Sequence, residues 1–164
     1  MLRGMTLGAL VAVASMLAGS GPSSHAVRAD EAEALRIADE LRTAILKGDS
    51  EAVAKRIPPE GWTFADTPIS RAELMKKLRP GGELYGTYFD TTRRRQHMQA
   101  VDEVLSYREW FAKYPAAKLT ATRWGEDRFC VGFDNGKCAT ACPLFHIRKD
   151  AKGRWWLFQH PDEV

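Results

Sequence analysis

Two kinds of hydrophobic pattern divide the chain, a helical one in its first half and an alternating one in its last third. Between positions 34 and 46 the apolar residues recur every three or four positions: Ala34, Leu35, Ile37, Ala38, Leu41, Ala44, Ile45 and Leu46. This stripe predicts an amphipathic helix. Gly48 is expected to end it. Asp49 or Ser50 is expected to cap a second short helix, which Pro58 ends.

The last third of the chain predicts four strands. They are read at residues 118–124, 128–133, 137–148 and 154–159. The short segments between them are turn sequences, and short turns imply antiparallel neighbours. A further short strand and turn are expected at residues 61–68. Helices come first and a sheet comes last, so the pattern predicts an α+β fold.

The middle of the chain carries two matching helix-start signals. A serine is followed three positions later by glutamate in the ranges Ser70–Glu73 and Ser106–Glu109. Each is a capping box, in which the two side chains satisfy free backbone N–H groups. The boxes predict helices at 71–78 and 107–113. The stretch between them, residues 83–101, is interpreted as strand or irregular structure.

The N-terminus indicates export. The run from Met5 to Gly19 carries no charge and is shorter than the about 20 apolar residues that span a bilayer. It resembles the apolar region of a secretory signal peptide. Cleavage after Ala26 or Ala29 fits the small residues there, and an uncleaved anchor is the alternative. Ala29 is preferred because the mature chain would then begin as a helix with acidic residues in its first turn, where the helix dipole favours them.

The signal peptide sets the predicted organisation of the chain. Residues 1–29 form the signal, and residues 30–164 form one domain of a soluble exported protein, periplasmic or secreted, with no membrane contact after cleavage. Loss of Arg3 and Arg28 lowers the formal net charge from +3 to +1. The densest basic cluster is "TTRRRQH", residues 91–97, and a nucleic-acid partner would need a larger basic surface. No nucleic-acid partner is therefore expected.

Three segments in order resemble a known superfamily. They are "LKGDSEAVAKRI", "PISRAELMKKL" and the C-terminal "KDAKGRWWLFQH". Together with the long first helix they resemble the nuclear transport factor 2-like superfamily, the cystatin-like α+β roll, over residues 32–160. The resemblance implies N-terminal helices packed on a curved, mostly antiparallel sheet that forms a cone. The cone of such proteins is an enzyme pocket, a ligand pocket or merely a core.

The fold does not by itself give the function, and binding is the favoured hypothesis. We expect non-catalytic binding of a small apolar ligand or a protein partner in or beside the cone, with a homodimer left open. The expected pocket residues are Trp62, Phe64, Trp156 and Phe158. Adjacent residues of a strand point to opposite faces, so one of Trp155 and Trp156 should lie in the core and the other should face a ligand or partner.

An enzyme is the first alternative. In the ketosteroid isomerase branch of the superfamily, a carboxylate after the first strand acts as general base, and Asp66 falls at the matching place. That branch also uses a hydrogen-bonding tyrosine on the first helix, where this chain has Leu41. Without that donor a large part of the electrostatic stabilisation is missing. A small lyase or isomerase would use Asp66 with His160 or His97 as the acid–base partner.

The cysteines raise the question of a disulfide. Cys130, Cys138 and Cys142 are an odd number in a chain expected to meet an oxidising compartment. A two-residue turn at Asn135–Gly136 and one extra residue near Pro143 would set Cys142 opposite Cys130. These geometries predict a Cys130–Cys142 disulfide. Three free thiols are the alternative.

A metal site is the last alternative. No cofactor is expected, but Cys138-x-x-x-Cys142 followed by proline resembles the motif of Sco copper chaperones. Thiolate and imidazole ligands suit Cu(I). His146 lies four residues further on, and a four-residue turn at Asp150–Gly153 would set His160 beside Cys142. The βαβ pattern of the Sco fold is absent from this sequence, and His146 is otherwise interpreted as an ordinary sheet residue.

Overall fold

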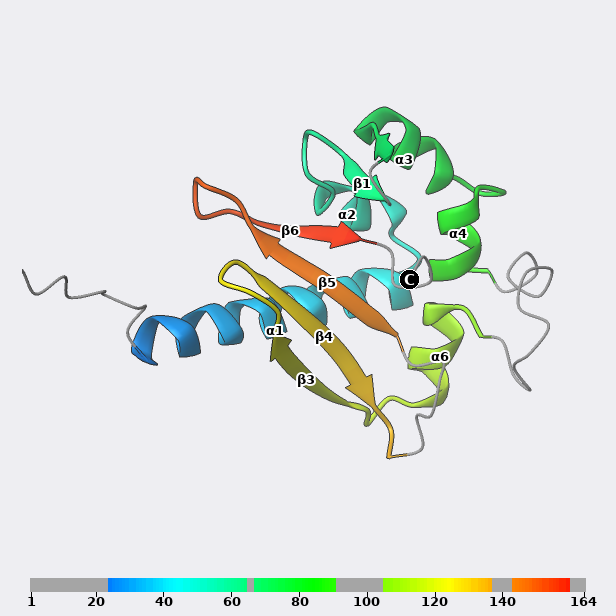
Figure 1. Ribbon diagram of the computed structural model, residues 1–164. Helices are drawn as coiled ribbons and strands as arrows, with labels where there is room; N and C mark the ends of the chain where they lie inside the picture. The colour runs from blue at the N-terminus through cyan, green and yellow to red at the C-terminus, as the bar shows by residue number, and fades with distance from the viewer. Residues whose placement is uncertain (1–23, 65–66, 91–104, 137–142, 160–164) are drawn as a thin grey trace, which may run out of the picture.

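The computed structural model describes residues 24–64, 67–90, 105–136 and 143–159. Its helices are α1 (Ser24–Lys47), α2 (Ser50–Lys55), α3 (Arg71–Lys77), α4 (Glu83–Tyr88) and α6 (Tyr107–Lys113) (Figure 1). Its strands are β1 (Trp62–Phe64), β2 (Thr67–Ile69), β3 (Lys118–Arg123), β4 (Arg128–Asp134), β5 (Leu144–Lys149) and β6 (Trp155–Gln159). The described helices all precede the four-stranded sheet, so the predicted α+β class is confirmed.

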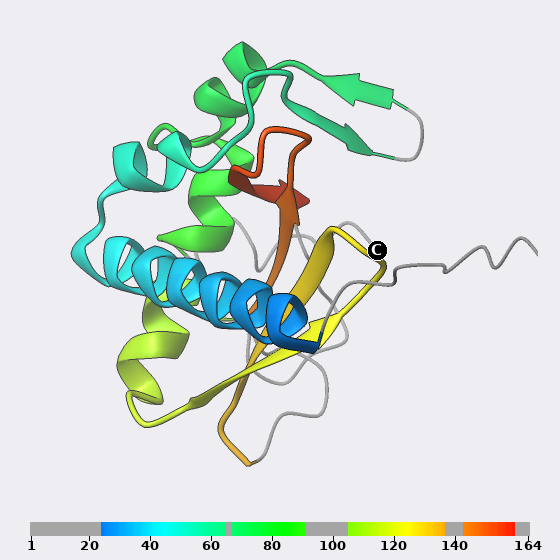
Figure 2. The same cartoon turned by 90° about the vertical axis from the view of Figure 1, so that its left-hand side faces the viewer.

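Helix α1 lies across one face of the sheet and buries six of the eight residues of the predicted stripe, whereas Leu35 is half-buried and Leu46 is exposed (Figure 2). The buried residues of the helix are Ala34, Ile37, Ala38, Leu41, Ala44 and Ile45. Gly48 ends it in the left-handed conformation, φ 72°, which favours glycine. In the full-length chain the helix begins at Ser24, and the start at Asp30 expected after cleavage stays a prediction. No glycine or proline between these two residues stops the helix from extending.

The two predicted capped helices are present. Ser106 N donates to Glu109 Oε2 at 2.9 Å, and Glu109 N donates to Ser106 Oγ at 3.3 Å, which is the complete capping box. At α3, Glu73 N donates to Ser70 Oγ at 3.2 Å. Helix α6 has the predicted bounds, and α3 ends one residue before the predicted Leu78. Local cap chemistry therefore identified both helix starts.

The interpretation of the next segment as strand or irregular structure is wrong for its first part, because Glu83–Tyr88 is helix α4. Gly86 and Thr87 are poor helix formers, which removed the local signal. Tertiary packing stabilises this helix despite its low helix propensity. Leu84 and Tyr88 are buried, and the Tyr88 and Tyr107 ring centroids are 5.3 Å apart in an edge-on arrangement. The rest of the segment from residue 91 lies outside the described residues.

The four predicted strands are confirmed, and residues 137–142 of the third lie outside the described residues. The sheet has the order β3-β4-β5-β6 with every neighbour antiparallel. Its side chains alternate: Trp155 and Leu157 are buried on the α1 side, and Trp156 and Phe158 are half-buried on the other. The prediction of one tryptophan on each face is therefore confirmed.

Two predicted registers are wrong. Cys130 pairs with His146, rather than lying opposite Cys142. The loop after β5 has five residues rather than four, because Lys149 pairs with Trp155, and a bulge follows at His146/Ile147. The length of the loop between two paired strands sets their register, and the sequence alone was compatible with more than one loop length.

The segment predicted as one strand and a turn forms two paired strands, β1 and β2. This hairpin is tied to the edge strand of the sheet by Trp62, whose Nε1 donates to Leu157 O at 2.8 Å in the buried interior. Leu157 N donates in turn to Arg56 O at 2.7 Å. The outer edge of β6 is thus partly satisfied by other parts of the chain, which blunts its ability to pair with another strand.

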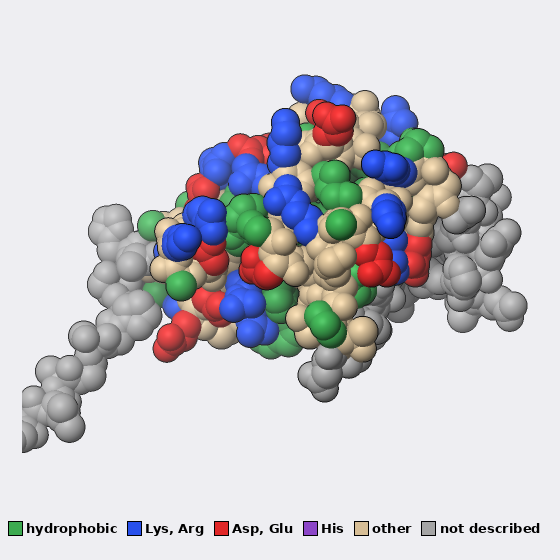
Figure 3. Space-filling view, turned by 90° about the horizontal axis from the view of Figure 1, so that it is seen from above, with side chains coloured by type: hydrophobic (Ala, Val, Ile, Leu, Met, Phe, Trp, Pro, Cys, Tyr) green, Lys and Arg blue, Asp and Glu red, His purple; other side chains and the backbone are tan. Residues whose placement is uncertain are grey.

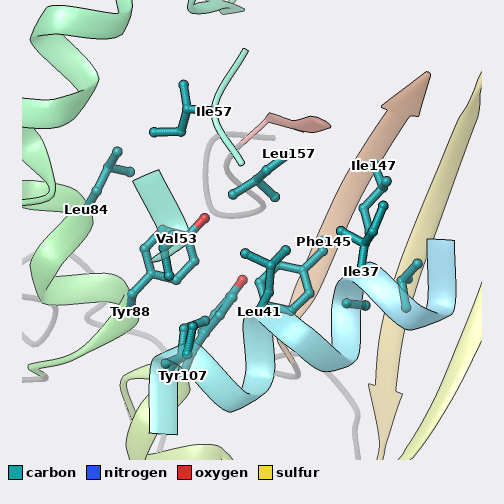
Figure 4. Close-up of a cluster of buried hydrophobic side chains, with 14 of the residues drawn as sticks. Ile37, Leu41, Val53, Ile57, Leu84, Tyr88, Tyr107, Phe145, Ile147 and Leu157 are labelled. Carbon is teal, nitrogen blue, oxygen red and sulfur yellow. The ribbon is translucent and has the colours of Figure 1, made fainter. Parts of the chain in front are cut away.

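The core lies between the helices and the α1 side of the sheet. Figure 4 shows side chains from α1, α2, α4, α6 and the strands meeting there, with Tyr107 beside Phe145. The Tyr107 and Phe145 ring centroids are 5.7 Å apart in an edge-on arrangement, which adds to the gain from burial. Among the described residues, no helix is long and apolar enough to cross a membrane.

Candidate functional site

The face of the sheet turned away from α1 carries most of the sheet's polar chemistry, and we call it the outer face. Strand alternation and register place these residues on it: Thr120, Thr122, Arg128, Cys130, Gly132, Leu144, His146, Arg148, Trp156 and Phe158. Two groups on this face combine aromatic rings with titratable side chains. One lies at β6 and the other at the centre of the sheet.

The group at β6 is built around Phe158. The Arg128 and Arg148 guanidinium carbons lie 5.1 and 5.3 Å from the Phe158 ring centroid, within cation–π range. Asp127 holds both arginines, with its carboxylate 3.1 Å from Arg148 Nε and 3.6 Å from Arg128 Nε. The ring is therefore flanked by two cations whose charge is partly balanced.

Asp150 orients the neighbouring tryptophan. Its carboxylate accepts hydrogen bonds from Trp156 Nε1 at 3.0 Å, Arg154 Nε at 2.8 Å and the backbone N–H groups of Lys152 and Arg154 at 2.9 Å. The bond from Trp156, with those from Arg154 and Lys152, holds the pKa of Asp150 well below its usual range. The Arg154 guanidinium also lies 5.1 Å from the Trp156 ring. The indole is thus fixed from its edge and from one face.

These side chains border a pocket, which we call the Trp156–Phe158 pocket. It has a volume of about 260 Å³ and lies between the segment leading into β1 and the outer face of β5 and β6. Its lining residues are Pro58, Glu60, Gly61, Thr63, Arg148, Asp150, Ala151, Trp156 and Phe158. The lining combines the two aromatic rings with the charged groups of Glu60, Arg148 and Asp150, so both apolar and polar surface face the space. Small-molecule sites likewise combine apolar surface with placed polar groups.

Gly61 allows the segment before β1, which forms one wall of the pocket, to pack closely against the end of β2. Its φ is 86°, and a Cβ built there would lie 2.1 Å from Ile69 O and 2.8 Å from Arg71 N. No side chain fits in that space. Glycine therefore allows the segment before β1 to lie against the end of β2, and this contact sets the position of the pocket wall.

A larger groove of about 600 Å³ lies between α1, α2 and the loop after β5. Leu41 and Ala44 contribute apolar surface to it, and Glu40 and Arg56 contribute charge. That charge is paired: Glu40 binds both Arg36 and Arg56. Figure 3 likewise shows basic and acidic side chains interspersed over the face seen there. The groove therefore presents no single sign of charge to a partner.

The second outer-face group joins Cys130, His146 and Trp124. Cys130 Sγ lies 3.5 Å from His146 Nδ1, and the Trp124 ring lies 5.3 Å from the imidazole. His146 is 5 % exposed, and its buried Nε2 has no hydrogen-bond partner among the described residues. Burial lowers the pKa of His146 and raises the pKa of Cys130. Both shifts favour a neutral thiol beside a neutral imidazole.

The pocket residues predicted from sequence are distributed as follows. Trp156 and Phe158 line the Trp156–Phe158 pocket. Trp62 is 3 % exposed and packs in the core, where it hydrogen-bonds to β6 instead of lining that pocket. Phe64 belongs to β1, and its side chain lies outside the described residues.

The other predicted site residues lie outside the described residues: Asp66, His97, Cys138, Cys142 and His160. Cys130 forms no disulfide with another described residue, and the Cys130–Cys142 disulfide stays a prediction because its second partner is not described. The described part of the chain holds no group of three or more His, Cys, Asp or Glu side chains suited to a metal ion.

Sequence reasoning missed three contributors. Arg148 and Asp150 flank the end of β5, and the aspartate opens a turn sequence, a position where it often binds nearby backbone N–H groups. That signal could have identified Asp150 as an anchor. The Cys130–His146 contact needed the correct register between β4 and β5, which the sequence did not determine. Comparisons of the chain with protein-family models, curated proteins and solved structures found no match.

Proposed function

We propose that this chain is a non-catalytic binding domain that takes a small, mostly apolar molecule in the Trp156–Phe158 pocket. The observation that supports this most is the fixed indole of Trp156, held by Asp150 and Arg154 at the wall of a pocket. A ring held in place before binding loses little entropy when a ligand stacks on its free surface. The arrangement is thus preorganised for an apolar face.

The pocket limits the size and charge of the ligand. Its volume of about 260 Å³ lies below the roughly 300–1,000 Å³ of sites for drug-sized ligands. A single ring or a short branched chain fits this space. The charged lining residues are of both signs. Arg148 pairs with Asp127, and Asp150 pairs with Arg154 outside the lining. Glu60 adds a second carboxylate, so the pocket offers no strong field of one sign. We therefore infer an uncharged ligand with one or two polar groups.

The same proposal extends to family and location. The helix-then-sheet order supports membership of the nuclear transport factor 2-like superfamily. The uncharged run from Met5 to Gly19 supports export to the periplasm or the medium. A protein partner, alone or as a homodimer, is the alternative occupant of the outer face. Trp124, with 53 % of its surface exposed, is the side chain that supports it.

Binding is tested with single-ring probes. The mature chain is titrated with phenol, indole, benzoate and benzylamine, and contact is followed by saturation-transfer NMR. For ligands of this size we expect dissociation constants of about 1 mM, with phenol and indole binding more tightly than the two charged probes. Trp156→Leu should abolish the transfer. Trp124→Leu, the matched control just beyond the end of β3, should leave it unchanged.

Two results would contradict the proposal. One is saturation transfer that survives Trp156→Leu. The other is transfer lost in Trp124→Leu, which would move binding to the centre of the sheet. The isomerase alternative rests on Asp66, His97 and His160, and no observation among the described residues favours it. The copper alternative with Cys138 and Cys142 likewise stays a proposal from sequence.

A further inference from the structure

Three charged side chains line the Trp156–Phe158 pocket, and they differ in how many of their polar atoms are already bonded. The Asp150 carboxylate accepts two hydrogen bonds on each oxygen, all from N–H groups of its own loop and of β6. A carboxylate has about four acceptor positions, so none is left for a ligand. Asp150 therefore holds the pocket wall, and Arg148 and Glu60 are the charged side chains that can recognise a ligand.

Arg148 keeps hydrogen-bond donors for a ligand. Its Nε donates to Asp127 Oδ2 at 3.1 Å, and its guanidinium carbon lies 5.3 Å from the centroid of the Phe158 ring. These two contacts hold the guanidinium beside the ring. Its two Nη atoms donate to no acceptor among the residues that the structure describes. A carbonyl oxygen of a ligand would thus meet donors that are already positioned at the pocket.

Glu60 supplies an acceptor from the opposite wall. It lies in the turn that is closed by the hydrogen bond from Gly61 N to Pro58 O at 3.0 Å. Gly61 packs against the end of β2, so the backbone of this turn is held in place. Within the described ranges the exposed Glu60 carboxylate has no hydrogen-bond or ion-pair partner. The pocket therefore has a free donor on the β5 side and a free acceptor on the side of the segment before β1.

We propose that the ligand of this pocket is an uncharged planar ring with a carbonyl acceptor on one edge and an O–H or N–H donor on the opposite edge. The inference rests on the binding function proposed above and names its ligand class. Arg148 donates to the carbonyl oxygen, Glu60 accepts from the donor, and the ring lies on Trp156. A space of about 260 Å³ holds one ring with two such substituents. Phenolic ketones with the two groups para to each other are the simplest members of this class.

The same two side chains select against charged ligands. A ligand with a single charge gains an ion pair at one wall and meets a like charge at the other, which is unfavourable. A neutral carbonyl and a neutral hydroxyl form hydrogen bonds with both walls, and hydrogen bonds to a charged group are stronger than those between neutral groups. Arg148 and Glu60 are thus the residues that determine specificity.

Three rings of similar size test the two contacts separately. 4-Hydroxyacetophenone carries both groups, 4-methoxyacetophenone lacks the donor, and 4-ethylphenol lacks the carbonyl. Each is titrated into the purified protein at pH 6, where the phenols keep their protons, and binding is followed by the NMR signal of the Trp156 indole N–H. We expect 4-hydroxyacetophenone to bind about tenfold more tightly than either of the others, the ratio that one hydrogen bond to a charged group provides.

Side-chain variants assign each contact to its residue. Glu60→Ala should weaken binding of 4-hydroxyacetophenone about tenfold and leave that of 4-methoxyacetophenone unchanged, because the methoxy compound has no donor for the carboxylate. Glu60→Gln keeps an acceptor oxygen and should recover part of the affinity. Arg148→Met keeps an apolar chain beside Phe158, so it should weaken binding of the two ketones and not that of 4-ethylphenol. Glu51→Ala, the matched control at an exposed carboxylate outside the pocket, should change none of these affinities.

Circular dichroism checks that each variant is folded. The inference is overturned if the three rings bind equally well, or if Glu60→Ala weakens binding of both ketones to the same extent, as a structural role would. Phenol that moves the Trp156 signal in that case shows that the pocket binds rings without this selectivity, and only the ligand class is then wrong. If neither phenol nor any of the three rings moves the signal, the binding function and the ligand class are both wrong.

Discussion

Replacing Gly61 with alanine tests whether the wall of the Trp156–Phe158 pocket is built as described. Gly61 has φ 86°, and the added Cβ would lie 2.1 Å from Ile69 O. Gly81 is a matched control, since its φ is 87° and an added Cβ there meets nothing within 4 Å. Both variants incur the left-handed penalty of about 1–2 kcal/mol per residue. Both also gain about 0.4–1 kcal/mol from a stiffer unfolded chain.

Only Gly61→Ala also forces backbone atoms apart, which adds roughly 1–3 kcal/mol as overpacking does in a core. We therefore expect Gly61→Ala to lower the free energy of unfolding by about 2–4 kcal/mol, and Gly81→Ala by about 1 kcal/mol. Urea unfolding followed by circular dichroism measures both. Equal losses, within about 0.5 kcal/mol, would refute the close approach and with it the described position of the wall.

Three further outcomes follow from the contacts of single side chains. Trp62→Phe removes the buried hydrogen bond to Leu157 O, so it should lower the free energy of unfolding, measured in urea, by about 1–3 kcal/mol. Trp124→Phe, at an exposed site, should change it by less than about 0.5 kcal/mol. Equal effects of the two substitutions would contradict the buried hydrogen bond. Ser106→Ala breaks the capping box of α6 and should cost about 1–2 kcal/mol in the same assay, and a silent change would exclude that cap. The pKa of Asp150 is lower in the folded state than its unfolded value near 3.8. The carboxylate therefore stabilises the fold at pH values above 3.8, and this stabilisation is lost progressively as the pH falls below 3.8. The difference in free energy of unfolding between wild type and Asp150→Asn should shrink from about pH 5 to about pH 2, and a constant difference would argue against the lowered pKa.

Local chemistry explains which parts of the fold could be predicted from sequence. Ser106 and Glu109 predicted the first residue of α6 correctly, because a capping box forms between residues that are close in the sequence. The four strands of the sheet were separated by turn residues that act just as locally. Helix α4 had no such signal. It contains Gly86 and Thr87, and its helical form depends on burial of Leu84 and Tyr88 against distant segments.

The candidate site was predictable only in part for the same reason. Strand alternation placed Trp156 and Phe158 on one face without knowledge of the fold. Which residues of β5 and of the loop after it contact Trp156 and Phe158 depends on the register between β5 and β6. A difference of one residue in the length of that loop changes this register. Trp62 was expected at the pocket and lies in the core, because the hairpin crosses the edge of β6. That crossing is a long-range contact with no local sequence signal.

The most direct test of the binding proposal is an NMR titration that follows the indole N–H signals of all five tryptophans. The Trp156 indole N–H is bonded to Asp150 at the pocket wall, so phenol or indole added at millimolar concentration should move its signal first and furthest. The signals of Trp62 and Trp124 should stay near their starting positions. Movement of Trp124 with a stationary Trp156, or no movement at all, would contradict binding in the Trp156–Phe158 pocket.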